Sequence, residues 1–239
     1  DPLWSRGLGD VYKRQVQENA PEREDFKTDL FARIDGILPP HVIVASSSSG
    51  LIMTRLQARC RHAGRFVIGH PFNPPHLIPL VEVVGGEQTS ADTIDRCIAF
   101  YRQLGKYPIR LNKEVPGHIA NRLQAALWRE AIHLAAENVA SVADIDAAVS
   151  QGPGLRWALF GPHMTFNLGG GAGGLAHFME HLLGPVQTWW DDLGTPDVTP
   201  ELQRRLIEGV NAEAGSRNIA DLVQTRDAQL TALLKVLQR

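Results

Sequence analysis

Apolar residues follow two patterns along the first half of the chain. Between residues 22 and 38 they recur at three- and four-residue spacing, which predicts an amphipathic helix that ends before Pro39 and Pro40. Further helices are predicted around 53–61 and over 90–104. Short apolar runs typical of buried strands are VIVA (42–45), FVIGH (66–70), LVEVV (80–84) and YPIRL (107–111). Helices that alternate with such strands predict an open α/β sheet with crossover helices.

The β-branched runs stop after Pro116, and the rest of the chain follows a helical pattern. Residues 118–139 predict one long helix. Ser141 opens a second helix, with Asp144 three positions later as in a capping box. This change of pattern predicts a domain boundary near residue 115.

The first fifteen residues fit neither pattern. Their end, DVYKRQ, resembles the translation of a transposon end used in preparing sequencing libraries, so we interpret residues 1–15 as an assembly scar. The remaining chain is expected to comprise an α/β domain over residues 16–114 and an all-helical domain over residues 115–239.

Composition narrows the class of function. Of the 239 residues 44% are hydrophobic, enough for a buried core, and the 24 basic and 26 acidic residues form no long basic run. This argues against a nucleic-acid or anionic-membrane partner, which needs clustered Lys and Arg. Two cysteines without metal-ligand spacing, and the lack of a long apolar segment or signal-peptide pattern, predict a cytoplasmic protein that acts on a small molecule.

A glycine-rich stretch in the helical half imitates a dinucleotide phosphate loop. Gly169, Gly171 and Gly174 satisfy the spacing G-x-G-x-x-G. Such a loop needs a strand before it and another after its helix, and neither is evident. We therefore favour a glycine-rich connection between helices.

A second imitation is the inverted zinc-protease signature H-x-x-E-H, formed by His177, Glu180 and His181. No third ligand is evident in the sequence. We interpret these residues as the polar face of an amphipathic helix and predict no metal site.

The strongest candidate for chemistry is a histidine between a strand and a proline-rich loop. His70 precedes Pro71, which favours an extended backbone, and Pro74, Pro75 and Pro79 restrict the loop further. A neutral imidazole can take the hydroxyl proton of an alcohol while hydride leaves the carbon. His70 is therefore the predicted general base of a dehydrogenation.

Glu82 is the charged residue within the apolar strand LVEVV. A buried carboxylate without a partner costs several kcal/mol, so Glu82 needs a partner. If the proline loop folds back so that His70 meets Glu82, the carboxylate would fix the imidazole tautomer and stabilise the imidazolium. The alternative is a stiff loop that leads into a core strand.

Polar residues near the predicted strand ends could complete a site. Ser46 to Ser49 follow VIVA, and Asn121 lies just past the predicted domain boundary. A doubly wound sheet binds ligands at the carboxyl ends of its strands, so these side chains could hydrogen-bond the substrate oxygen. A tight turn for the serines and a helix-surface position for Asn121 are the alternatives.

The order of ASSSSG, GHPFNPPHLIPLVEVV and EVPGHIANRL resembles the 3-hydroxyacyl-CoA dehydrogenase family, from about residue 16 to the C-terminus. The resemblance implies NAD as cofactor, a partial doubly wound (Rossmann-type) sheet followed by an all-α C-terminal domain, and a homodimer through the helical domain. The catalytic residues that it implies are His70, Glu82, Ser49 and Asn121. The NAD-binding residues that it implies are Glu22, Lys27, Ser47 and Asn73.

The stretch GPGLRWALFGP (152–162) resembles the branch of that family that includes lambda-crystallin, gulonate 3-dehydrogenase and carnitine dehydrogenase. This likeness implies a short, free L-3-hydroxy acid as substrate, with Arg156 as a candidate bidentate clamp for its carboxylate. A structural ion pair is the alternative for Arg156. Two other functions stay open: a short-chain 3-hydroxyacyl-CoA dehydrogenase acting on CoA thioesters, and a noncatalytic structural protein of the crystallin kind.

Members of the family begin with a glycine-rich turn that holds the pyrophosphate of NAD and an acidic residue for the ribose, and the chain shows neither. It is therefore expected to be an N-terminally truncated fragment with an open sheet edge. We predict that the 239-residue chain binds NAD poorly, aggregates and is inactive as it stands. Titration calorimetry with NAD tests this, and tight stoichiometric binding would contradict it.

Overall fold

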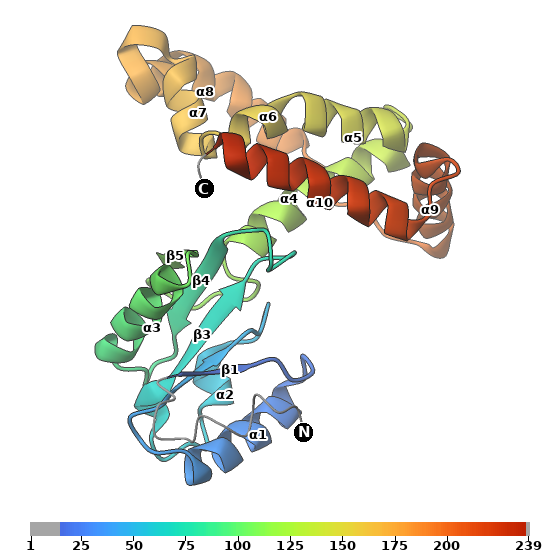
Figure 1. Ribbon diagram of the computed structural model, residues 1–239. Coiled ribbons are helices and arrows are strands. Elements are labelled where there is room, and N and C mark those ends of the chain that lie inside the picture. The colour runs from blue at the N-terminus through green and yellow to red at the C-terminus, as the bar shows by residue number, and fades with distance from the viewer. Residues whose placement is uncertain (1–14, 238–239) are drawn as a thin grey trace. The chain divides into compact units, whose positions relative to one another are not determined.

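The computed structural model describes residues 15–237. The chain divides into two compact units, Asp1–Leu123 (unit 1) and Gln124–Arg239 (unit 2) (Figure 1). The interpretation of residues 1–15 as a scar falls, except for Gln15, outside the described residues.

Unit 1 is an α/β unit in which strands and helices alternate. Its elements are β1 (Gln15–Glu18), α1 (Glu24–Ile37), β2 (Ile43–Ser46), α2 (Met53–Leu56), η3 (Ala63–Arg65), β3 (Phe66–Pro71), β4 (Leu80–Gly85), α3 (Ala91–Gln103) and β5 (Tyr107–Arg110). Helix α4 (Ala120–Ala136) begins in unit 1 and continues in unit 2. The predicted fold class, a Rossmann-type α/β sheet followed by an all-helical part, is confirmed.

The strands form one sheet in the order β1-β2-β3-β4-β5. Neighbouring strands are parallel except β3 and β4, which run antiparallel. Helices connect the parallel neighbours, as predicted, whereas the proline loop joins β3 directly to β4. The loop 72–79 that joins them is shorter than the dozen or more residues of a crossover, so the chain has to fold straight back.

Two apolar clusters cover the two faces of the sheet. Ile68 packs with Phe31 of α1 on one face, whereas Val67 packs with Tyr101 of α3 on the other. Figure 1 shows α1 and α3 on opposite sides of the strands. Successive residues of a strand point to opposite faces, so a strand covered on both sides has to be apolar throughout. This explains the continuous apolar runs in the sequence and makes the carboxylate of Glu82 an exception that needs a cause.

Gly69 lets helix α3 approach the sheet closely. A Cβ atom placed on Gly69 would lie 2.2 Å from the hydroxyl oxygen of Tyr101. The same hydroxyl donates to the carbonyl oxygen of Gly69 at 3.4 Å. The residue before His70 therefore has to be glycine for this packing to form.

Two elements of unit 1 differ from the sequence-based prediction. The polar pattern QVQE does not predict β1, which nevertheless pairs in parallel with β2. The helix predicted around 53–61 ends at Leu56. The carboxylate of Asp35 accepts hydrogen bonds from the backbone N–H groups of Arg61 at 2.6 Å and His62 at 3.0 Å, and these bonds hold the chain in a turn.

Unit 2 is helical. Its elements after α4 are α5 (Val142–Gln151), α6 (Pro153–Trp157), α7 (Pro162–Gly169), η4 (Gly171–Gly173), α8 (Gly174–Asp192), α9 (Pro200–Ala214) and α10 (Ile219–Val236). Ser141 accepts a hydrogen bond from the backbone N–H of Asp144 at 3.1 Å, as predicted for the start of α5. Within residues 15–237 no helix is long and apolar enough to cross a membrane.

The two imitated motifs lie on helices. Helix α7 precedes the glycine-rich stretch and α8 follows it, so the prediction of a helix connection is confirmed. His177, Glu180 and His181 are exposed side chains of α8, as expected for the polar face of an amphipathic helix.

Candidate active site

A buried histidine and a buried glutamate face each other across β3 and β4. His70 lies opposite Glu82 in the antiparallel register, and its Nδ1 is 2.9 Å from Oε2 of Glu82. Directly opposed residues of antiparallel strands carry their Cβ atoms on the same face of the sheet. The structure thus brings together the two residues for which the sequence predicts a pair, and the fold-back of the proline loop is the cause.

The second carboxylate oxygen of Glu82 is held by the start of helix α4. Its Oε1 accepts hydrogen bonds from the backbone N–H groups of Ile119 at 2.8 Å and Ala120 at 3.0 Å. The first N–H groups of a helix have no partner within the helix and favour a negative charge. Gly117 and His118, with φ of 75° and 52°, turn the chain in the left-handed region just before these donors.

These bonds decide the protonation of the pair. Burial alone would raise the pKa of Glu82, but the hydrogen bond with His70 and those from Ala120 and Ile119 outweigh burial and hold this pKa below its ordinary value. An ionised carboxylate only accepts hydrogen bonds, so Nδ1 of His70 carries the proton. The lone pair of the neutral imidazole then lies on Nε2, which is the basic atom of the pair.

The loop after β2, residues 47–50, is here called the serine loop. Oε1 of Glu22 accepts hydrogen bonds from Oγ of Ser48 at 2.6 Å and from the backbone N–H groups of Ser49 at 3.0 Å and Gly50 at 3.1 Å. Successive N–H groups that converge on one oxygen form an anion-binding nest. The nest orders the loop at the carboxyl edge of the sheet.

The other predicted site residues of unit 1 are distributed unevenly around this loop. Nδ2 of Asn121 donates to the carbonyl oxygen of Ser49 at 2.9 Å, and Oγ of Ser47 donates to the carbonyl oxygen of Glu18 at 2.8 Å. Asn73 is exposed in the loop 72–79 and makes no hydrogen bond with the serine loop in the described part of the chain. The structure therefore brings Glu22, Ser49 and Asn121 together, but not Asn73.

Lys27 lies in a buried ion pair. Its Nζ donates to both carboxylate oxygens of Glu18, at 2.8 and 2.9 Å, and to the carbonyl oxygen of Ala20 at 2.9 Å. The Lys27 side chain is 1% exposed, and its Nζ lies 3.8 Å from Oε2 of Glu22. Its ammonium group thus neutralises the charge of Glu18 and also stabilises the negative charge of Glu22.

His118 belongs to the site although the sequence analysis did not single it out. Its ring is buried, its centroid lies 5.4 Å from that of His70, and its Nε2 is 3.0 Å from the carbonyl oxygen of Ser48. Burial lowers the pKa of His118 more than the hydrogen bond to Ser48 raises it. The available signal was a histidine in the otherwise apolar and turn-forming stretch VPGHIA, but its burial depends on contacts distant in the sequence.

Arg156 lies in unit 2, on the short helix α6, and is exposed. Among the described residues, no side chain forms an ion pair with its guanidinium group.

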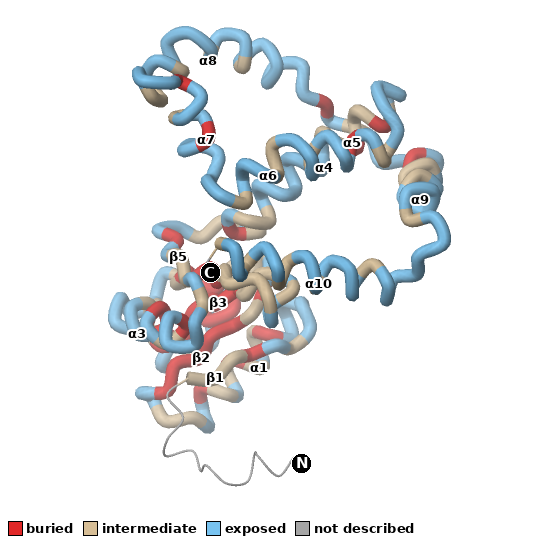
Figure 2. Tube along the Cα trace, turned by 45° about the horizontal axis from the view of Figure 1, so that its top comes forward, coloured by how far each residue is buried: buried red, intermediate tan, exposed pale blue. Residues whose placement is uncertain are grey.

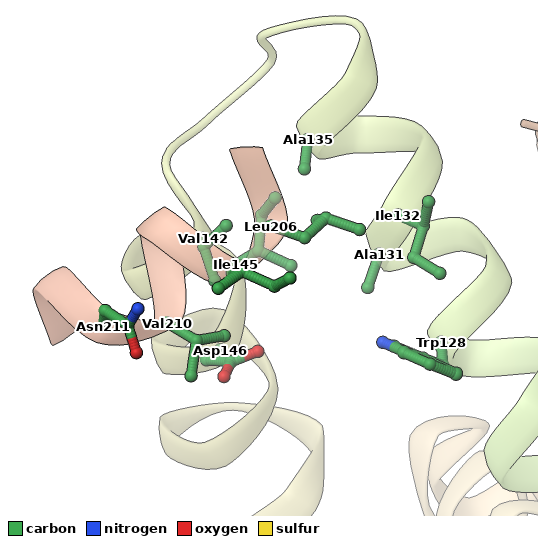
Figure 3. A pocket seen from close by; sticks show the side chains of 11 residues that line it. Trp128, Ala131, Ile132, Ala135, Val142, Ile145, Asp146, Leu206, Val210 and Asn211 are labelled. Carbon is green, nitrogen blue, oxygen red and sulfur yellow. The ribbon is translucent and has the colours of Figure 1, made fainter. Parts of the chain in front are cut away.

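Unit 2 contains an apolar groove of about 340 Å³ between α4, α5 and α9. Figure 3 shows its lining, in which Ile132, Ile145 and Leu206 point toward one another and Trp128 lies at one end. None of the predicted site residues lines this groove.

Two protein-family profiles match consecutive parts of the chain. The description 3-hydroxyacyl-CoA dehydrogenase, NAD binding domain, applies to residues 10–115, and 3-hydroxyacyl-CoA dehydrogenase, C-terminal domain, to residues 117–208. The chain belongs to the 3-hydroxyacyl-CoA dehydrogenase family. NAD is the cofactor of this family, as predicted, and the first match begins inside the stretch 1–15.

The chain is similar to the L-carnitine dehydrogenase of Streptomyces coelicolor, with 49% identity over 224 residues. The aligned region covers 94% of the chain and 70% of that protein. The predicted resemblance to the branch that includes carnitine dehydrogenase is confirmed.

Solved structures agree with the fold. The crystal structure of 5-formyl-3-hydroxy-2-methylpyridine 4-carboxylic acid 5-dehydrogenase, an NAD⁺-dependent dismutase, is 31% identical, with a TM-score of 0.76 over 94% of the chain and 72% of that structure. The (S)-3-hydroxybutyryl-CoA dehydrogenase of Ralstonia eutropha is 36% identical, with a TM-score of 0.56 over 65% of the chain and 53% of that structure.

The depressed pKa of Glu82 predicts how the stability of the protein depends on pH. A group whose pKa is lower in the folded state stabilises the fold above its unfolded pKa, about 4.3 for glutamate, and this contribution disappears as the pH falls through the folded value. We expect Glu82→Gln to lower the free energy of unfolding at pH 7 by about 1–3 kcal/mol. The difference from the wild type should shrink below pH 4.

Urea unfolding at several pH values measures this difference, with Glu87→Gln, which changes an exposed carboxylate two residues after β4, as the matched control. A loss of stability in Glu82→Gln that stays constant down to pH 3 would show that the charge of Glu82 contributes nothing.

Proposed function

We propose that the protein catalyses the NAD-dependent oxidation of the 3-hydroxyl group of a short, free L-3-hydroxy acid, and that L-carnitine is the first substrate to test. The observation that carries the proposal is the buried hydrogen bond between His70 and Glu82, because it leaves a basic Nε2 on an oriented imidazole. The 49% identity to an L-carnitine dehydrogenase supports the choice of substrate.

His70 is the proposed general base. Its Nε2 accepts the hydroxyl proton of the substrate while the C–H bond at the same carbon breaks and a C=O bond forms. Bound NAD would supply the acceptor for the hydride. The carboxylate of Glu82 stabilises the imidazolium that results, and it remains ionised because three hydrogen bonds hold it.

The serine loop suits both substrate and cofactor. Ser49 is exposed and Asn121 is half-buried, and their polar side chains lie at the carboxyl edge of the sheet, where an alcohol oxygen could accept or donate a hydrogen bond. Glu22, whose side chain is 40% exposed, can reach a ribose hydroxyl. The residues present therefore fit NAD at this edge.

We further propose that Ser47 and Asn73 bind NAD at the same edge, and that Lys27 contributes through Glu22. The ammonium group of Lys27 already donates to Glu18 and Ala20, so it supports the site as a buried positive charge.

Arg156 is the proposed clamp for the substrate carboxylate. Its exposed guanidinium group can bind a carboxylate through two parallel hydrogen bonds. A CoA thioester has no free carboxylate at that position, so Arg156 would separate the two substrate classes.

The test is an assay of NAD reduction with L-carnitine, gulonate, 3-hydroxybutyrate and 3-hydroxybutyryl-CoA, on the chain and on the chain extended by upstream coding sequence of its parent DNA. We expect the extended chain to turn over a free acid, and His70→Ala in that chain to lower kcat/KM roughly 10²- to 10⁴-fold because the base is removed. Arg156→Ala should raise KM for the free acid roughly 10- to 100-fold and leave any thioester activity unchanged.

Turnover of only the thioester, unaffected by Arg156→Ala, would assign the protein to the short-chain 3-hydroxyacyl-CoA dehydrogenases. No turnover of any of the four by the extended chain would favour the noncatalytic, crystallin-like function. His70→Ala with full activity would exclude His70 as the base.

The helical unit supports the proposal of a homodimer. Figure 2 shows that exposed residues cover most of its helices, and these include Trp128, Trp189 and Trp190, each more than half exposed. Apolar surface of this extent is typical of an interface.

For the fraction of the chain that stays in solution, we expect sedimentation equilibrium to give a mass about twice the 26.3 kDa of the chain. Val210→Asp, which places a charge in the apolar groove of unit 2, should shift the protein toward the monomer. A monomeric wild type at micromolar concentration would contradict the dimer.

A further inference from the structure

Three consecutive carbonyl groups of the serine loop accept hydrogen bonds from one short segment, residues 117–121. The backbone N–H of Gly117 donates to Gly50 at 3.4 Å, Nδ2 of Asn121 donates to Ser49 at 2.9 Å, and the imidazole of His118 bonds to Ser48 at 3.0 Å. The same segment donates its Ile119 and Ala120 N–H groups to Glu82. One turn therefore contacts both the serine loop and the carboxylate that orients His70.

Among these contacts, the bond from His118 is the most buried. A carbonyl oxygen only accepts, so Nε2 of His118 carries a proton and donates to Ser48. His118 is 2% exposed, and its Nδ1 has no hydrogen-bond partner among the described residues. Burial of the acceptor Nδ1 without a partner lowers the stability of the folded state. The hydrogen bond through Nε2 offsets part of this loss.

The conformation of His118 carries a second cost. Its φ of 52° lies in the left-handed region, which a residue with a Cβ atom adopts rarely. This conformation directs the following N–H groups of Ile119 and Ala120 toward Glu82, while the side chain reaches back to Ser48. The unpartnered Nδ1 and the left-handed backbone thus both belong to His118, the residue that connects the serine loop to the donors of Glu82.

We infer that His118 is a positioning residue that couples the serine loop to the His70–Glu82 pair. As a neutral imidazole it holds the carbonyl group of Ser48 and so fixes the place of the neighbouring Ser49 hydroxyl relative to His70. The consequence for the reaction rests on the proposed function, because it is Ser49 that would bind the substrate oxygen. The coupling between the serine loop and the His70–Glu82 pair does not depend on the proposed function.

Amide hydrogen exchange of the soluble fraction of the 239-residue chain, or of the extended chain, tests the coupling without any substrate. His118→Phe keeps an aromatic ring but removes the donor, and we expect faster exchange confined to peptides that contain the serine loop and residues 117–121. His118→Gln, which restores an N–H donor, should return the exchange toward that of the wild type. The matched control is His41→Phe, an exposed histidine of unit 1.

Unchanged exchange of the serine loop in His118→Phe would overturn the inference. Faster exchange throughout unit 1 in both His118→Phe and His118→Gln would also overturn it, because His118 would then support the fold in general.

A double-mutant cycle tests the consequence for catalysis in an active form of the enzyme. We expect His118→Phe to lower kcat/KM roughly 5- to 30-fold, mainly through kcat, and to change it less than about twofold when Ser49→Ala is already present. His118→Gln should recover most of the loss. Equal effects in both backgrounds would overturn the coupling through Ser49.

If no substrate is turned over, the proposed function fails while the exchange result still decides the coupling. If a substrate is turned over and the cycle is additive, the proposed function stands and the inference fails.

Discussion

The buried charge of Glu82 is the constraint on which the rest of the site depends. A carboxylate inside a sheet that is covered on both faces is stable only if hydrogen bonds compensate for the lost water. Here the imidazole of His70 meets one oxygen, and two N–H groups at the start of α4 meet the other. The left-handed turn before α4 aims the two N–H donors at this carboxylate, and the ionised carboxylate sets the tautomer of His70.

The same principle operates at the edge of the sheet. Glu18, Glu22 and Lys27 form a second group of charges around the ends of β1 and β2, and Ser46 donates to Glu18 at 2.6 Å. The ammonium group of Lys27 and the hydroxyl group of Ser46 bind the carboxylate of Glu18. Hydroxyl and backbone N–H groups of the serine loop bind that of Glu22. The serine loop therefore has a defined shape before any ligand arrives, and such preorganisation is what a site needs to orient a substrate oxygen.

The two units differ in how they bury apolar surface. Unit 1 places an apolar cluster on each face of its sheet, whereas unit 2 leaves large apolar side chains exposed on α4, α8 and α9. A helix buries only one stripe of its surface against a neighbouring helix. The apolar side chains outside that stripe need further contacts to become buried. The His70–Glu82 pair therefore lies in the unit with the covered sheet, whereas association is expected of the unit with the exposed apolar side chains.

The sequence by itself determined the α/β character of the first half, the helical character of the second and the pairing expected of His70 with Glu82. These depend on local periodicity, on prolines that restrict the chain, and on the cost of an isolated carboxylate in an apolar strand. Only the tertiary structure decided the donors at Ile119 and Ala120, the burial of Lys27 against Glu18 and the position of His118. Each of these rests on partners distant in the chain. Hydrogen bonds between distant residues depend on register and turn geometry, and residue types and their spacing do not specify either.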